Sequence, residues 1–283
     1  MSFENLNLHP LIIKAINEAG YTSPTPIQQQ AIPELLSGHD VMASAQTGTG
    51  KTAAFVLPAL HQLATPAKVR SRGPRVLVLT PTRELALQVT DAATKYGRYL
   101  PRTKAISILG GMPYPVQNKL LSQAVDILVA TPGRLLDHIQ RGRIDFSRLE
   151  MLVLDEADRM LDMGFIDDVE RIASATPATR QTLLFSATLD SAIDKIAARL
   201  LKTPKRIQIA TQRARLENIE QRLHYVDNLS HKNRLLGHVL QDETLKQAIV
   251  FTATKRDADT LADNLSTQGY DAAAMHGDMH HRE

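Results

Sequence analysis

The chain has 283 residues, with 33 Lys and Arg against 30 Asp and Glu, so its net charge of +3 excludes a protein that holds nucleic acid by bulk charge alone. The absence of cysteine excludes disulfides, thiolate nucleophiles and zinc–thiolate sites, and fits a reducing cytoplasm. The N-terminus does not read as a signal peptide, and no apolar run approaches the roughly 18 residues of a membrane-spanning helix, so we expect a soluble, cytoplasmic protein.

Short apolar runs alternate with helical patterns along most of the chain. Apolar residues at helical spacing predict a helix over residues 8–19, followed by others that include 53–63, 84–99 and 133–141. The expected strands are VMASA (41–45), RVLVLT (75–80), AISIL (105–109), DILVA (126–130), EMLVLD (150–155) and TLLFSA (182–187). Because nearly continuous apolar runs are typical of strands buried on both faces, the pattern predicts an α/β doubly wound fold with a parallel sheet.

Distinctive polar residues directly follow these expected strands. Ligands of open α/β sheets bind at the carboxyl ends of the strands, so we expect one functional edge. The segments at this edge are 46–52, 81–84, 131–134, 155–158 and 186–188.

Residues 45–52 read AQTGTGKT, a candidate phosphate-binding loop between a strand and a helix. Gly48 and Gly50 let the backbone wrap around phosphates, with amides and a helix N-terminus facing the negative charge. We expect Lys51 to reach the β- and γ-phosphates and the Thr52 hydroxyl to ligate Mg²⁺. Ala45 replaces the first Gly of the general pattern, and a Gly/Thr-rich surface turn is the alternative interpretation. The predicted ATP-binding residues of this loop are Gln46, Thr47, Gly48, Thr49, Gly50, Lys51 and Thr52.

The expected strand at 150–155 ends in acidic residues, and residues 155–158 read DEAD. Asp155 is expected to hold Mg²⁺, directly or through water, and Glu156 to orient and activate the attacking water. Two adjacent carboxylates repel each other, which a bound cation relieves. A solvated acidic loop is the alternative for this tetrapeptide alone. We assign the catalytic roles to Lys51, Asp155 and Glu156.

The motifs AQTGTGKT, DEAD and SAT (186–188) resemble motifs of the DEAD-box ATP-dependent RNA helicases, and the resemblance extends over the whole chain. It implies a RecA-like parallel sheet sandwiched by helices, followed by a partial second RecA-like domain. The stretch GYTSPTPIQ (20–28) resembles the adenine-reading Q motif of that family. By this resemblance Gln28 binds the adenine edge, and Phe3 and Tyr21 are candidates to stack on the base. Packing under the first helix is the alternative for both aromatic residues.

The resemblance also implies RNA-binding and coupling residues. PTREL (81–85), Gly110–Gly111 and TPGR (131–134) resemble segments that contact the RNA backbone, which predicts binding that is nearly independent of base sequence. The predicted RNA-binding residues are Thr82, Arg83, Gly111, Thr131 and Arg134. Pairing with surface acids is the alternative for the two arginines. Asp158, Ser186 and Thr188 resemble the relay that couples the state of ATP to RNA binding.

We expect the first domain to span residues 1–207, a linker 208–219, and an incomplete second domain 220–283. In the second domain we expect strands at 221–227, 247–254 and 272–276, with helices ending near Leu240 and Leu265. The family's later segments, which carry arginines for the γ-phosphate, are absent from this sequence. We therefore expect the 283-residue chain to bind ATP and Mg²⁺ but to turn ATP over weakly.

Three other functions use some of the same residues. A nucleotide-switched RNA-binding module without helicase activity would keep every motif but would not need hydrolysis. A DNA-directed helicase or another ATPase would share the phosphate loop, but the Gln28 motif and the DEAD tetrapeptide together resemble the RNA family, and competition between RNA and DNA strands of one sequence would separate the two. A small-molecule kinase leaves PTREL, TPGR and SAT unexplained.

Overall fold

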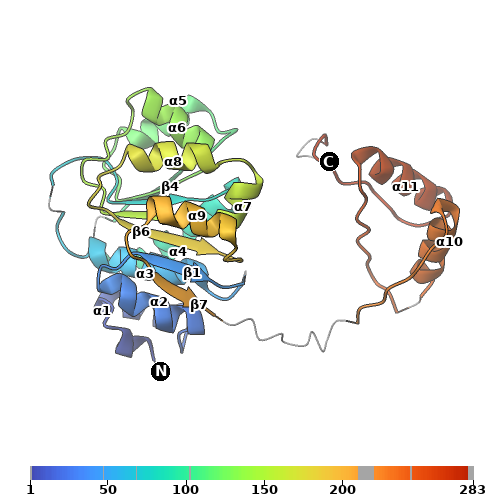
Figure 1. Cartoon of the computed structure of the whole chain (residues 1–283), viewed down its shortest axis with the longest axis horizontal. Coiled ribbons are helices and arrows are strands. Elements are labelled where there is room, and N and C mark those ends of the chain that lie inside the picture. The colour runs from blue at the N-terminus through green and yellow to red at the C-terminus, as the bar shows by residue number, and fades with distance from the viewer. Residues whose placement is uncertain are drawn as a thin grey trace. The chain divides into compact units, whose positions relative to one another are not determined.

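The computed structural model describes residues 2–46, 48–67, 69–101, 103–209, 220–242 and 244–279 (Figure 1). The chain divides into two compact units, Met1–Ala214 and Arg215–Glu283. The first unit contains a seven-stranded sheet of order β3-β4-β2-β5-β6-β1-β7. Every neighbouring pair of strands is parallel, so the predicted α/β fold with a parallel, RecA-like sheet is confirmed.

The six predicted strands all form. The strands are β1 Val41–Ser44, β2 Val76–Leu79, β3 Ala105–Ile108, β4 Ile127–Ala130, β5 Met151–Leu154, β6 Gln181–Ser186 and β7 Lys205–Gln208. Four of them, β1, β2, β4 and β5, are buried at every position, as their continuous apolar sequences predict.

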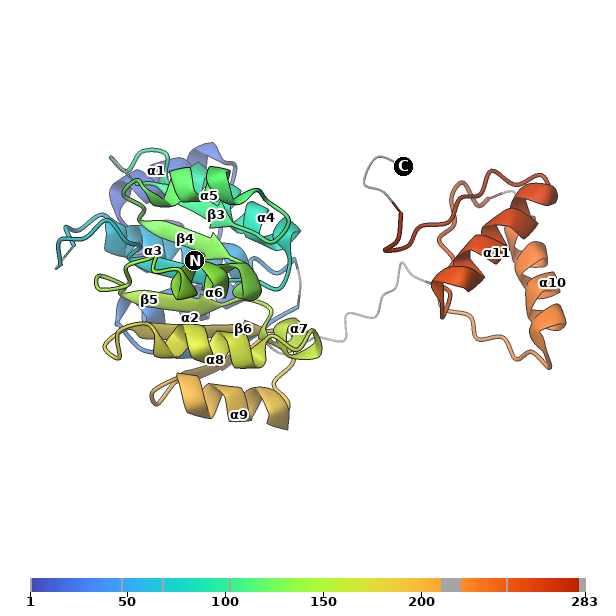
Figure 2. The ribbon, with the colours of Figure 1, turned by 90° about the horizontal axis from the view of Figure 1, so that it is seen from above.

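Helices cover both faces of this sheet (Figures 1 and 2). The helices of the first unit are η1 Phe3–Leu6, α1 Pro10–Glu18, α2 Pro26–Leu36, α3 Lys51–Leu63, α4 Arg83–Gly97, α5 Tyr114–Leu121, α6 Pro132–Gln140, α7 Ala157–Asp162, α8 Ile166–Ser174 and α9 Ser191–Leu200. Alternate strand residues face opposite layers. Val41 and Ala43 pack with residues of α1 to α4, whereas Met42 packs with residues of α6 to α9.

Strand β7 is not predicted by the sequence. Its four residues have three exposed side chains and one buried one, Ile207, which is 5% exposed. Charged side chains at a sheet edge discourage pairing with another chain. In β7 they also interrupt the continuous apolar sequence that predicts the other strands. The expected linker therefore begins too early at 208, since Gln208 is the last residue of β7. Residues 210–219 of that expected linker lie outside the described residues.

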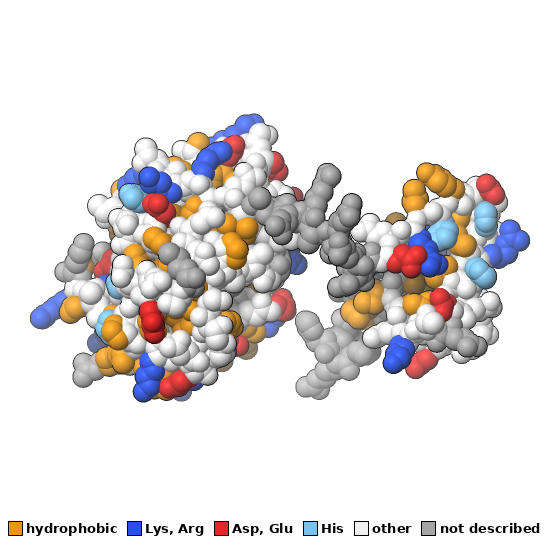
Figure 3. All heavy atoms as spheres, turned by 90° about the horizontal axis from the view of Figure 1, so that it is seen from below, with side chains coloured by type: hydrophobic (Ala, Val, Ile, Leu, Met, Phe, Trp, Pro, Cys, Tyr) orange, Lys and Arg blue, Asp and Glu red, His pale blue; other side chains and the backbone are white. Residues whose placement is uncertain are grey.

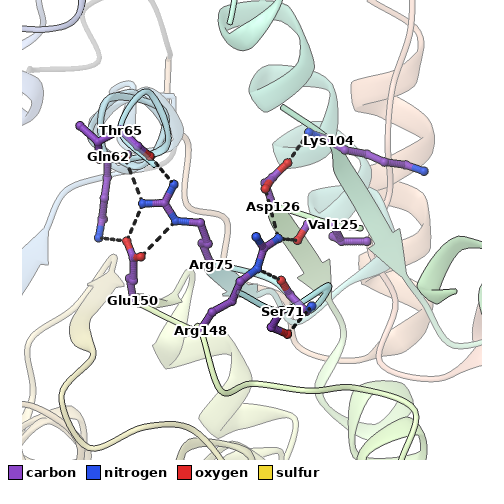
Figure 4. A network of polar contacts seen from close by, with 10 residues as sticks. Gln62, Thr65, Ser71, Arg75, Lys104, Val125, Asp126, Arg148 and Glu150 are labelled. Atoms are coloured by element: carbon purple, nitrogen blue, oxygen red, sulfur yellow. Dashed lines mark hydrogen bonds and ion pairs between the residues drawn. The ribbon is translucent and has the colours of Figure 1, made fainter. Parts of the chain in front are cut away.

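Ion pairs tie together the amino-terminal ends of the central strands (Figure 4). The Arg75 guanidinium donates to both carboxylate oxygens of Glu150, at 3.1 and 2.9 Å, and to the carbonyls of Gln62 and Thr65. The Arg75 side chain is only 5% exposed, so these partners offset the cost of burying its charge. A second pair, Arg148 with Asp126 at 3.2 Å, lies beside it. This end of the sheet is opposite to the predicted functional edge, so we assign these pairs a structural role.

Changing Glu150 to Ala should lower the free energy of unfolding by about 2–3 kcal/mol, because it leaves the Arg75 charge buried without its carboxylate. Urea unfolding followed by circular dichroism measures this loss. Glu170→Ala is the matched control, since it removes a 2.8 Å pair with Arg199, whose side chain is 64% exposed. An equal loss in the control and in Glu150→Ala would show that burial of the pair is not the cause.

The second unit contains two helices among its described residues, α10 Leu229–Leu240 and α11 Lys255–Thr267, both as predicted. Their first turns are capped, because the Asn228 side chain accepts from the His231 amide and Thr254 accepts from the Asp257 amide. The prediction of strands at 221–227, 247–254 and 272–276 is wrong for the described residues, since none of these segments pairs with another.

Unpaired apolar side chains of those segments remain on the surface. Tyr225 is 86% exposed, Ile249 78% and Phe251 93%, and apolar side chains lie beside charged and histidine side chains on this unit (Figure 3). A strand needs a hydrogen-bonded neighbour and a cover for its apolar face, and an apolar sequence alone supplies neither. Across the described residues of both units, no helix has the length and hydropathy to cross a bilayer.

Candidate nucleotide and RNA site

The predicted site residues of the first unit follow the carboxyl-terminal ends of its parallel strands. In the sheet, β5, β6 and β1 lie side by side, and so do β3, β4 and β2. The loops that follow the first three strands are therefore close together, as are the loops that follow the other three. This strand order separates the candidate residues into a nucleotide part near β1 and a backbone-binding part near β3 and β4.

The loop between β1 and α3 has the backbone that a phosphate cradle requires. Gly48 and Gly50 have φ of 83° and 91°, a region that glycine enters without steric cost. A side chain at Gly50 would place its Cβ 2.4 Å from Nε2 of Gln28. The Thr49 hydroxyl and amide both donate to the Gln46 carbonyl, at 2.6 and 3.4 Å, and close the turn. Thr47 lies outside the described residues.

Ala45, which departs from the usual glycine, is a packed residue at the start of this loop. Its side chain is 3% exposed, and its amide donates to the Ser186 carbonyl of β6 at 3.2 Å. The neighbouring Ser44 hydroxyl donates to the Ala187 carbonyl at 3.1 Å. The loop therefore starts from a backbone anchored on the adjacent strand, and a methyl group fills the core at that point.

The oppositely charged side chains of Lys51 and Asp155 are both buried, but they do not form a hydrogen bond or an ion pair with each other. Lys51 is the first residue of α3 and is 7% exposed, and Asp155 follows β5 and is 4% exposed. Within the described part of the chain, the Lys51 Nζ and the Asp155 Oδ1 are both buried without a hydrogen-bond partner. Buried polar atoms are rarely left unpaired, so both atoms fit a charged ligand between them.

Burial raises the pKa of the Asp155 carboxyl to about 7, against the opposing charge of Lys51 and with a further increase from Glu156. Burial of an unpaired carboxylate favours its protonated form. A divalent cation would favour the ionised form instead. Among the described residues, no group of three His, Cys, Asp or Glu side chains could hold a metal ion. The carboxylate of Asp155 fits Mg²⁺, which commonly uses one or two carboxylates together with substrate phosphates.

With a chelator and no nucleotide, Asp155→Asn should raise the free energy of unfolding at pH 8 by roughly 2–4 kcal/mol. The pKa of Asp155 moves from 3.8 to about 7 on folding, so the folded chain binds this proton more tightly than the unfolded chain. The cost of ionisation therefore grows as pH rises through this range, and the two proteins should be equally stable near pH 4. Urea unfolding at both pH values measures the difference, with the exposed Asp162→Asn as control. Equal stability of Asp155→Asn and wild type at pH 8 would contradict the buried, unpaired carboxyl.

Glu156 has an unusual backbone conformation at the start of α7. Its φ of 55° and ψ of 54° are left-handed, which costs a non-glycine residue about 1–2 kcal/mol. Its carboxylate is 15% exposed and lies 3.4 Å from Nη1 of Arg159. Strain of this kind concentrates at functional sites, and here it orients an acidic side chain next to Asp155.

Asp158 and the loop after β6 are hydrogen-bonded to each other. The Asp158 carboxylate accepts from the Ala187 amide at 3.0 Å. The Ser186 hydroxyl accepts from the Thr188 amide at 3.3 Å. The structure therefore brings together the loops that carry the three predicted coupling residues.

Gln28 connects α2 to the phosphate loop. Its side-chain oxygen accepts from the Thr25 amide at 3.0 Å, and its Nε2 donates to the Gly50 carbonyl at 3.0 Å. The side chain is 5% exposed. The amide can still offer a second hydrogen and a second lone pair to an adenine edge.

The two candidate stacking residues lie in different surroundings. Phe3 is 4% exposed and packs in the hydrophobic core beside Leu6. Tyr21 is 45% exposed, and its ring lies edge-on to Tyr96 of α4 at 6.0 Å. The Phe3 ring therefore packs with the first helix, as in the alternative interpretation, whereas the Tyr21 ring packs against α4 and keeps nearly half of its surface exposed.

The predicted RNA-binding residues come together from three loops. A side chain on Gly111 would meet Nη1 of Arg83 at 2.5 Å, so this guanidinium lies against the glycine. The Thr131 hydroxyl accepts from the Gly110 amide at 3.3 Å. Arg134 donates from Nη1 to the Met112 carbonyl at 2.5 Å. Thr82 caps α4, since its hydroxyl accepts from the Leu85 amide at 3.4 Å.

Gln117 is a residue of this part of the site that sequence analysis missed. It is fully buried, and its amide group bonds the amide and carbonyl of Leu109 at 3.2 Å and the Met112 carbonyl at 2.8 Å. These bonds fix the glycine loop that carries Gly111. A glutamine shortly after a Gly–Gly pair is the only signal that the sequence offers.

Comparison with known proteins agrees with this geometry. Residues 25–196 match the DEAD/DEAH box helicase family. The chain is 46% identical over 278 residues to the ATP-dependent RNA helicase DeaD of Mycobacterium tuberculosis, in a match that covers 98% of this chain and 48% of that protein. It is 43% identical over 282 residues to the DEAD-box ATP-dependent RNA helicase RhpA of Helicobacter pylori, covering 100% of this chain and 56% of RhpA.

A solved structure shows the same relationship. The crystal structure of a DEAD box protein from the hyperthermophile Methanococcus jannaschii is 37% identical, with a TM-score of 0.69, over 100% of this chain and 74% of that one. The chain spans about half the length of the curated relatives it matches. By the family match and by this structural relative, the chain belongs to the DEAD/DEAH box helicase family.

Proposed function

We propose that this protein is an ATP-dependent RNA helicase that binds Mg²⁺ and ATP at the β1 and β5 loops and the backbone of single-stranded RNA at the β2, β3 and β4 loops. The observation that carries the proposal is the pair of buried, unpartnered atoms Lys51 Nζ, directly after the glycine-rich loop, and Asp155 Oδ1, directly after β5. Homologous proteins named as ATP-dependent RNA helicases support it. RNA and ATP meet in the cytoplasm, where we propose that the protein works.

The nucleotide would be held by groups that the fold orients in advance. Lys51 would donate to the β- and γ-phosphates, and the amides of the phosphate loop would face the same charge. Thr52 and Asp155 would hold Mg²⁺, which when bound neutralises charge that develops on the phosphates. Glu156 would orient the attacking water and accept its proton. Gln28, Phe3 and Tyr21 are proposed for the adenine.

RNA would be held mainly through its phosphates. Arg83 and Arg134 offer guanidinium donors, and Thr82, Gly111 and Thr131 offer hydroxyl and amide groups at the ends of β2, β3 and β4. Contacts of this kind do not read base edges, so the binding should be nearly independent of sequence. Asp158, Ser186 and Thr188 would transmit the state of the nucleotide. The bond from the Ala187 amide to Asp158 joins the loops after β5 and β6, and the Ser186–Thr188 bond lies within the second of these loops.

Binding of a labelled single-stranded oligouridylate tests the proposal. We expect higher RNA affinity with Mg²⁺ and a non-hydrolysable ATP analogue than with Mg²⁺ and ADP, and we expect ATP hydrolysis to increase with RNA. An oligodeoxynucleotide of matched sequence separates an RNA-directed from a DNA-directed protein. Nucleotide-dependent RNA binding with no hydrolysis above the uncatalysed rate would favour the nucleotide-switched binding module instead.

A further inference from the structure

Tyr114, at the start of α5, has its ring close to Arg134 of α6 and to Arg141, the residue that follows α6, and it is absent from the motifs that predict function. The guanidinium carbon of Arg134 lies 4.3 Å from the centre of the Tyr114 ring, and that of Arg141 lies 4.5 Å from it. The Tyr114 hydroxyl donates to Oδ2 of Asp137 at 2.8 Å. The same carboxylate oxygen is 3.9 Å from Nε of Arg134. One aromatic ring and one acid therefore constrain the Arg134 side chain from two directions.

The spacing of these residues along α6 explains why they meet at one ring. Positions 134, 137 and 138 are three or four residues apart, so they occupy one face of α6, and Arg141 follows directly as the C-cap residue. His138 completes the cluster, with its ring centre 5.5 Å from that of Tyr114 and with no exposed surface. Burial, and then the charges of Arg134 and Arg141, lower the pKa of His138, so it is a neutral support beneath the tyrosine.

Contacts on more than one side restrain the long side chain of Arg134 at the proposed binding edge. Its side chain is 12% exposed, and Nη1 is already bound to the Met112 carbonyl. An arginine has five donors, so this contact leaves others for a phosphate. A cation over an aromatic ring is stabilised by about 0.5–2 kcal/mol, which is enough to select one of several side-chain rotamers. An arginine that is ordered before binding loses less entropy when it meets a phosphate.

We propose that Tyr114 is a positioning residue that holds the Arg134 guanidinium in place to bind an RNA phosphate. The inference rests on the proposed function, because it requires Arg134 to contact RNA. Tyr114 acts through the arginine and makes no contact with RNA in this account. The ring face is the essential feature, and the hydroxyl bond to Asp137 is an accessory to it.

The affinity of the chain for an oligouridylate, measured with Mg²⁺ and a non-hydrolysable ATP analogue, tests this role. Tyr114→Leu and Tyr114→Met should each weaken RNA binding about three- to tenfold, since they remove the ring that stacks on the arginine. Tyr114→Phe keeps the ring and should stay within about twofold of wild type. Affinity for the ATP analogue should not change in any of the three. Using both Leu and Met ensures that a folding defect in one does not decide the result.

Tyr99 supplies a matched control in the same chain. Its ring lies 4.3 Å from Lys14 Nζ and 5.1 Å from the Arg98 guanidinium carbon, and its hydroxyl donates to Glu18. It thus has the same kind of surroundings but follows α4 at the end away from Arg83. Tyr99→Leu should leave RNA affinity unchanged, and an equal loss in Tyr99→Leu would overturn the inference.

A double-variant cycle separates positioning from an independent contact. If Tyr114 acts only through Arg134, the pair Arg134→Ala with Tyr114→Leu binds RNA as weakly as Arg134→Ala alone. Losses that multiply would overturn the inference while leaving the RNA site in place, as would unchanged affinity in both Tyr114→Leu and Tyr114→Met. Unchanged affinity in Arg134→Ala would instead overturn the proposed RNA contact itself, and the inference with it.

Discussion

Changing Glu156 to Gln should slow ATP hydrolysis by roughly 10²–10⁴-fold while ATP affinity stays within about threefold of wild type. Glutamine keeps the size of the side chain but cannot accept a proton from the attacking water. The left-handed backbone at Glu156 orients its carboxylate beside Asp155, and the substitution does not alter that backbone preference. Single-turnover release of phosphate, with a saturating oligouridylate, measures slow rates directly.

The rates of Glu170→Gln and Glu156→Gln are each compared with the rate of wild type. Glu170→Gln changes an acid of α8 that pairs with Arg199 and lies away from the phosphate loop, so its rate should equal that of wild type. Equal rates for Glu156→Gln and wild type would show that another group activates the water.

Lys51→Ala should weaken binding of ATP by at least about 100-fold, because two hydrogen bonds to charged phosphates are each worth about 1.5–3 kcal/mol. The loss should come from binding and not from unfolding. Since the Lys51 Nζ is buried without a partner among the described residues, its removal costs the folded chain no hydrogen bond. Isothermal titration measures the affinity, and thermal unfolding checks that the variant remains folded.

Lys195→Ala is the control for a change of one positive charge. Lys195 is exposed on α9, so its removal should leave the affinity for ATP unchanged. A variant of Lys51 that binds ATP as tightly as wild type would place the triphosphate elsewhere, and the assignment of Gly48, Gly50 and Thr52 would be lost with it.

Local sequence patterns predict the parts of this protein that depend on neighbouring residues in the chain. The phosphate loop and the DEAD tetrapeptide are each a single uninterrupted segment of the sequence, and each follows an apolar run that forms the expected strand. The parallel sheet places them on one edge without further information. The same reasoning fails for β7, where a single buried residue, Ile207, holds a charged edge strand in the sheet.

Contacts between distant segments are the part that the sequence does not reveal. The bond from Gln28 to the Gly50 carbonyl spans 22 residues, and the bond from Ser44 to the Ala187 carbonyl spans 143. Tyr114 has no motif of its own, and its relation to Arg134 depends on how α5 packs on α6. The strands expected in the second unit fail for a related reason, because Phe251 and its neighbours find no paired strand or cover among the described residues.

We propose that one pocket, between the phosphate loop and the acids after β5, binds Mg²⁺ and ATP. A titration of the isotopically labelled chain with the Mg²⁺ complex of a non-hydrolysable ATP analogue tests it by nuclear magnetic resonance. We predict that the amide resonances of Gly48, Gly50, Lys51 and Asp155 shift together and saturate at one affinity. A groove of about 530 Å³, lined by residues that include His39, Arg180 and Lys202, lies at the opposite end of the strands. Shifts confined to that groove, with the phosphate loop unchanged, would contradict the account.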